Sequence, residues 1–221
     1  KTTTETYDMG WDMLRNFKKT EIKEKTEIEK ELDTIRILMN KLTQDNYDTI
    51  IQHIKTSIEK IKETLKEAKR LGTKGISFTG GGESTIHPGY LEIIEYANKI
   101  GLDIGTITNG STITERNVEK FLENLQWIRF SMAGGDRESY KKVQGVDQFE
   151  LIMKNIKLLS DKKQELKQQM NIGIRTLVTP DNINTLEGFA NRIKNMNINY
   201  YQLAPDEFTT DKGEFWNSKN T

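Results

Sequence analysis

The sequence predicts an α/β fold in which parallel strands alternate with helices. Two observations predict it. After Gly72, five short apolar segments rich in β-branched and aromatic residues are separated by segments with helical spacing, the pattern of parallel strands joined by helical crossovers. Each apolar segment is also followed by a loop of Gly, Asn, Ser, Asp or Pro. The spacing suits either a barrel or a doubly wound sheet.

The amino-acid composition limits the classes of function that the chain can have. The 221 residues contain 33 Lys and Arg and 33 Asp and Glu, so there is no strong nucleic-acid signal. With no Cys and two His, we expect no disulfide and no metal site within these residues. No apolar run approaches the roughly 18 residues of a membrane span, and the amino end is polar. We therefore expect a cytoplasmic protein with no membrane association.

Two amphipathic helices are predicted before the first strand. Residues 20–44 and 47–70 carry apolar side chains every three or four positions, which predicts a helical hairpin. Gly72 is expected to cap its second arm. We divide the chain into an N-terminal helical segment, 1–57, and an α/β part, 58–221.

The α/β part is predicted to consist of alternating strands and helices. Strands are predicted at 75–79, 103–108, 127–131, 171–177 and 198–203. Helices are predicted at 90–100, 114–124, 137–142, 147–168 and 184–195, with Thr114 as the N-cap of the second. Because parallel strands end at one edge of a sheet, their five loops should lie together there and carry the chemistry.

The loop after the first strand is the strongest candidate site. Gly80, Gly81 and Gly82 expose backbone amides and carbonyls, which suit a zwitterionic or phosphate-bearing ligand. Glu83 can only accept hydrogen bonds, so it favours a ligand ammonium group. The alternative is a tight strand-to-helix turn with no ligand.

Three further side chains at this edge are candidate binding residues. Asn109 and Ser131 follow or end strands and can bind ribose hydroxyls or a carboxylate. Arg175 lies inside a strand, where an unpaired charge is unfavourable, so we expect it to reach a ligand carboxylate. The alternative is an ion pair with a neighbouring Asp or Glu. None of these groups is a strong nucleophile, so no catalytic residue is assigned.

The loop motifs resemble the radical S-adenosylmethionine enzymes over about residues 58–207. The resemblance is carried by Gly80–Pro88, by Thr108-Asn109-Gly110, by Arg129–Asp136 with Tyr140, by Leu177–Asn182 and by Tyr201–Pro205. It implies a partial parallel (β/α) barrel of about five strands, with the family's first strand absent. Its cofactor would be S-adenosylmethionine, and its substrate a small molecule or a peptide.

The resemblance also implies roles for the candidate residues. Gly80–Gly82 and Glu83 would hold the methionyl ammonium, while Ser131 and Arg175 would face the ribose or carboxylate. Asn109 would line the same pocket. Ser84 departs from the proline that the family often has there.

The chain lacks the family's CxxxCxxC loop, which holds a [4Fe–4S] cluster. The cluster is therefore expected only if its cysteines lie outside this chain. Because the first residue is Lys1, we expect the chain to be part of a longer one. If that loop lies upstream, the chain belongs to an enzyme whose cluster cleaves the cofactor to methionine and a 5′-deoxyadenosyl radical. Without it, the chain would bind the nucleoside only.

Residues 20–50 are similar to the opening helix pair of the middle domain of eukaryotic initiation factor 4G, through Asn40-Lys41-Leu42-Thr43 and Tyr47. That domain binds a helicase and RNA. The similarity implies an alternative function, a non-catalytic helical module that binds a protein or RNA partner through residues 20–70.

Overall fold

The computed structural model describes residue 30, residue 34 and residues 44–80 and 82–205. The chain divides into two units, residues 1–67 and 68–221, with the boundary near the end of α3 (Gln44–Arg70). This helix confirms the second arm of the predicted hairpin. Most of the first arm, Gly81 and residues 206–221 lie outside the described residues.

The predicted cap of α3 is confirmed. Gly72 has a φ of 96°, in the region that favours glycine, and its N–H donates to the Lys69 carbonyl at 3.0 Å. The Thr73 N–H donates to the Ala68 carbonyl at 3.0 Å. These bonds satisfy carbonyl groups of the last helical turn and direct the chain into the first strand.

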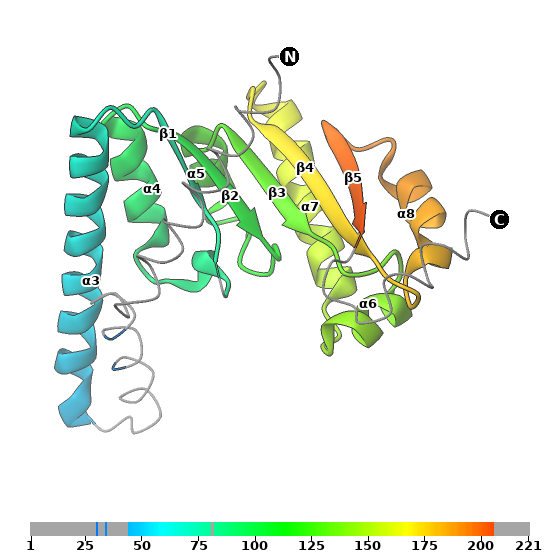
Figure 1. Cartoon of the computed structure of the whole chain (residues 1–221), viewed down its shortest axis with the longest axis horizontal. Coiled ribbons are helices and arrows are strands. Elements are labelled where there is room, and N and C mark those ends of the chain that lie inside the picture. Colours follow the sequence, from blue (N-terminus) through cyan, green and yellow to red (C-terminus); the bar gives the residue numbers. More distant parts are fainter. Residues whose placement is uncertain (1–29, 31–33, 35–43, 81, 206–221) are drawn as a thin grey trace, which may run out of the picture. The chain divides into compact units, whose positions relative to one another are not determined.

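In the described part of the chain, five parallel strands form one sheet in the order β1-β2-β3-β4-β5 (Figure 1). The strands are β1 (Gly75–Phe78), β2 (Asp103–Thr108), β3 (Trp127–Ser131), β4 (Asn171–Val178) and β5 (Tyr200–Pro205). The sequential order favours a barrel over a doubly wound sheet, and the sheet is not closed. The predicted partial barrel is thereby confirmed.

The helices that follow the strands belong to the second unit. They are α4 (Tyr90–Lys99), α5 (Val118–Asn124), α6 (Arg137–Gln144), α7 (Phe149–Glu165) and α8 (Leu186–Ile193). In Figure 1, α4, α5 and α7 lie behind the strands, and α6 lies beyond their carboxyl ends. In the part of the chain that the structure describes, no helix has the length and apolar character to cross a membrane.

Helix α5 begins later than predicted. The expected start and cap at Thr114 are wrong, because the helix begins at Val118 with Asn117 as its N-cap. The Asn117 side chain accepts the Thr114 N–H at 2.7 Å and donates to the Thr112 carbonyl at 2.9 Å. These local bonds hold residues 112–117 in a turn that competes with helix formation.

Alternation along the strands separates a packed face from an open one. Buried apolar side chains such as Ile104, Ile128 and Ile174 form the core with the helices. On the other face, Trp127 lies so close over Gly105 that any side chain there would collide with its ring. Tyr200 covers Gly173 in the same way. These aromatic rings occupy the face at positions nearer the amino ends of their strands, leaving the carboxyl edge for the site.

Candidate functional site

Glu83 joins the turn after β1 to the end of β2. Its Oε1 accepts hydrogen bonds from the Thr85 N–H at 3.2 Å, from the Thr85 hydroxyl at 2.6 Å and from the Thr108 hydroxyl at 2.8 Å. Its Oε2 accepts the Asn109 N–H at 2.6 Å. The carboxylate therefore caps the short helix at Ser84–Ile86 and fixes the Gly-rich turn against the neighbouring loop.

Glu83 and Asn109, the two predicted polar residues beside this turn, each keep hydrogen-bonding capacity for a ligand. Oε2 of Glu83 makes one hydrogen bond, although a carboxylate oxygen can accept two. The Asn109 side-chain oxygen accepts the Ser111 N–H at 2.8 Å, while its amino group donates to no described residue. An acceptor and a donor are thus held side by side, on Glu83 and on Asn109.

Gly80 and Gly82 are open positions. A Cβ atom added to either would have no neighbour within 4 Å, and neither has the positive φ that only glycine adopts easily. Packing and backbone conformation among the described residues therefore give no reason for glycine at Gly80 or Gly82. Bare backbone at the end of a strand leaves room for a ligand to approach.

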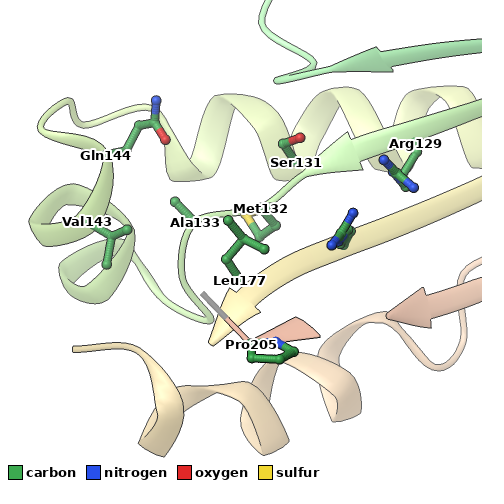
Figure 2. A pocket seen from close by; sticks show the side chains of 9 residues that line it. Arg129, Ser131, Met132, Ala133, Val143, Gln144, Leu177 and Pro205 are labelled. Atoms are coloured by element: carbon green, nitrogen blue, oxygen red, sulfur yellow. The ribbon is translucent and has the colours of Figure 1, made fainter. Parts of the chain in front are cut away.

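A cavity of about 410 Å³ lies at the carboxyl ends of β3, β4 and β5. Its lining is formed by Arg129, Ser131, Met132, Ala133, Val143, Gln144, Arg175, Leu177 and Pro205. Figure 2 shows Arg129 at one end, Val143 and Gln144 of α6 at the other, and Met132 and Leu177 between them. This volume is within the range of small-molecule sites.

Arg129 and Arg175 bring two positive charges to this cavity. The Nε of each is buried and has no hydrogen-bond partner. Neither guanidinium forms an ion pair with any described residue, so the alternative of a paired Arg175 finds no partner among them. Buried donors without acceptors are rare in native proteins, so their presence here indicates a place for an anionic ligand.

The rim of the cavity is fixed by Asn182, which is fully buried. Its side-chain amino group donates to the Ala133 carbonyl at 2.9 Å and to the Leu177 carbonyl at 2.8 Å, and its oxygen accepts the Thr179 N–H at 2.9 Å. Asn182 thus ties the loops after β3 and β4 together. We did not assign Arg129 or Asn182 to the site from sequence, although Arg129 precedes Ser131 by two residues and so shares its face.

The predicted site residues fall into two groups. Gly80, Gly82, Glu83 and Asn109 follow β1 and β2, whereas Ser131 and Arg175 are paired across β3 and β4 and line the cavity. The first group does not line it. Three strand spacings separate β1 from β4, about 14 Å, so a ligand that touches both groups must be extended along the edge.

Two ionisable groups beside the Gly-rich turn are perturbed by burial. The Tyr90 hydroxyl donates to the Thr106 hydroxyl at 2.8 Å, and burial, with the Glu83 charge adding to it, raises the pKa of Tyr90 to about 12. Nδ1 of His87 accepts the Gly89 N–H at 3.0 Å, and burial lowers the pKa of His87. Both groups are therefore neutral near pH 7.

A second cavity, of about 570 Å³, is lined by residues of β4, β5, α8 and the short helix before α8, including Ile183, Leu186, Tyr201 and Leu203. It contains none of the predicted binding residues, and its lining has one charged residue, Glu187. We therefore place the candidate site at the carboxyl edge.

An open parallel sheet of consecutive β/α units, with glycines and charged groups at its carboxyl edge, defines a protein with a partial α/β barrel. The sequence model of the Radical SAM superfamily matches residues 43–193. The chain belongs to this superfamily.

Two curated proteins illustrate the sequence similarity of this chain to known proteins. The Probable GTP 3',8-cyclase of Pyrococcus abyssi (strain GE5 / Orsay) is 29% identical over 135 residues, 61% of this chain and 43% of the relative. The same-named protein of Pyrococcus horikoshii is 35% identical over 100 residues, 45% of this chain and 32% of the relative. The chain thus spans less than half the length of these relatives.

Solved structures share the fold. Streptococcus suis SuiB bound to S-adenosylmethionine matches 70% of this chain and 35% of its own, with a TM-score of 0.55 and 19% identity. A domain of pyruvate-formate lyase-activating enzyme from Bacteroides vulgatus matches 66% of this chain and 89% of its own, with a TM-score of 0.50 and 18% identity. These matches give no support to the alternative of a helical interaction module.

The residues present do not fit a [4Fe–4S] cluster, because the sequence contains no cysteine thiolates. They do fit S-adenosylmethionine, since open glycine backbone, an acceptor on Glu83 and the guanidinium of Arg175, which no described residue pairs, lie along one edge.

Proposed function

We propose that this chain binds S-adenosylmethionine along the carboxyl edge of its sheet, as part of a radical S-adenosylmethionine enzyme. The observation that carries the proposal is the open backbone at Gly80 and Gly82, where the described part of the fold itself does not require glycine. Residue by residue, the edge matches a zwitterion joined to a nucleoside. Both groups of site residues would contact the methionyl end of this ligand and the ribose beside it.

Each residue has a proposed role. The free acceptor capacity of Glu83 and the carbonyls of Gly80–Gly82 would take the ligand ammonium. The guanidinium of Arg175, for which no described residue is a partner, would take the carboxylate, and Ser131 with Asn109 would donate to or accept from ribose hydroxyls. Tyr90 and His87 would hold the turn in place without carrying charge.

Radical chemistry needs a CxxxCxxC loop from outside these 221 residues, because they offer no ligand to a cluster. With such a loop in place, cluster and cofactor would together supply radical chemistry to the substrate. The contribution of this chain is to bind and orient the cofactor and to shape the substrate cavity beside it. We propose a small-molecule substrate, which the cyclase relatives, named for GTP, favour over a peptide. A protein partner at residues 20–70 and a cytoplasmic location remain predictions.

Calorimetric titration of the chain with S-adenosylmethionine tests the proposal. We expect saturable binding at one site, and we expect Gly82→Ala to weaken it at least tenfold while the melting temperature stays within about 2 °C, since the new Cβ touches no described atom. The matched control is Gly188→Ala, another open glycine, which lies in α8. No binding to the intact chain, or equal weakening by both variants, would contradict the proposal.

A further inference from the structure

The cavity at β3–β5 carries more positive charge than the proposed cofactor can neutralise. Among the described residues, Arg129 and Arg175 are the charged side chains in its lining, and no described carboxylate lines it. With S-adenosylmethionine bound, two guanidiniums, an ammonium and a sulfonium would face two carboxylates, that of Glu83 and that of the ligand. Counted over the described residues of the whole edge, two positive charges then remain unmatched, and unpaired charge in a partly enclosed site is costly.

The geometry brings the two guanidiniums to one place. Ser131 pairs with Arg175 across β3 and β4, and Arg129 precedes Ser131 by two residues, so both arginines lie on the same face. Their Cα atoms are separated by one strand spacing and two residue rises, about 8 Å. Each guanidinium has five N–H donors, and none is bound by a described acceptor. Ser131 and Gln144 add neutral donors to the same lining.

We propose that Arg129, with Arg175, binds a phosphoryl group carried by the substrate; the assignment to the substrate rests on the proposed function. A phosphate monoester carries between one and a half and two negative charges near pH 7, about the charge that the edge leaves unmatched. Its three oxygens accept bidentate hydrogen bonds from planar guanidiniums better than from other cations. Arg175 has enough donors to serve the cofactor carboxylate and the phosphoryl group together.

The test is an NMR titration of the full ¹⁵N-labelled chain with methyl phosphate at constant ionic strength, following the arginine Nε–Hε signals. We expect the signals of Arg129 and Arg175 to shift saturably and the affinity to fall at least tenfold in Arg129→Gln. Arg116→Gln, at an exposed arginine outside the cavity, should change it less than twofold. No saturable shift, equal effects at Arg116 and Arg129, or tighter binding of malonate than of methyl phosphate would overturn the inference.

Two further measurements separate this inference from alternatives. Arg129→Gln should keep or raise the melting temperature, because it removes an uncompensated charge; a fall would indicate a structural role and overturn the inference. Its affinity for S-adenosylmethionine should stay within threefold, and loss of that affinity would place Arg129 in the cofactor site instead.

If the intact chain binds methyl phosphate but not S-adenosylmethionine, the anion site stands and the proposed function fails. If it binds only S-adenosylmethionine, the inference alone fails.

Discussion

At the scale of single residues, Glu83 has both a structural role and a proposed binding role. Four hydrogen bonds from Thr85, Thr108 and Asn109 fix its carboxylate between the first two loops. The same carboxylate supplies negative charge to the candidate site. A mutation here would therefore change structure and binding together, so cleaner tests use residues with fewer structural contacts.

Arg175 is such a residue. Because its guanidinium has no described partner, Arg175→Gln should leave the fold intact. If Arg175 binds the methionyl carboxylate, the variant should lose affinity for S-adenosylmethionine by about 10-fold to 100-fold, the range for a charge-assisted hydrogen bond. Methylthioadenosine, which lacks the carboxylate, should bind the intact chain and the variant alike. Calorimetry with both ligands checks this, and equal losses for both would assign Arg175 to another role.

His87 should make stability depend on pH. Burial lowers its pKa below the usual 6.5, so the folded state holds fewer protons than the unfolded state. Its contribution to stability is complete above pH 6.5 and is lost as pH falls through the lowered pKa. We expect the melting temperature to drop between pH 7.5 and pH 5.5, and His87→Asn to reduce that drop. The matched control is His53→Asn, and an unchanged drop in His87→Asn would contradict this account.

The loops after β3 and β4 matter most at the scale of elements, because they form the cavity rim. Asn182→Ala would remove three hydrogen bonds and leave the Ala133 and Leu177 carbonyls short of a partner. We expect unfolding free energy to fall by about 2–3 kcal/mol in denaturant titration. The exposed Asn191→Ala should change it by less than about 0.5 kcal/mol. Similar effects from both variants would show that Asn182 does not hold the rim.

Strands and most helices could be predicted from the sequence because β-branched runs and helical spacing are local signals. The start of α5 could not, because the side chain of Asn117 closes a turn that spacing does not reveal. The hydrogen bonds that Glu83 accepts from Thr108 and Asn109 could not be predicted either, because they join the loop after β1 to the end of β2. Arg129 could have been assigned to the site from the sequence, since an arginine two residues before Ser131 in a strand shares its face.

At the scale of the whole molecule, the chain belongs to the Radical SAM superfamily but has no cysteine to bind a cluster. We predict that anaerobic reconstitution of this chain with ferrous iron and sulfide gives no protein-bound [4Fe–4S] absorption and no cleavage of S-adenosylmethionine. A buffer sample without protein provides the control. A stoichiometric cluster on these 221 residues would contradict the view that its ligands must come from elsewhere.

The most direct measurement of the central claim is a map of backbone amide shifts in the ¹⁵N-labelled chain as S-adenosylmethionine is added. The account predicts saturable shifts at Gly80, Gly82 and Asn109 together with Ser131 and Arg175, since the ligand must extend across the carboxyl edge of the sheet. Shifts confined to the amino ends of the strands, near Gly75, Asp103 and Asn171, or no shifts at all, would contradict it.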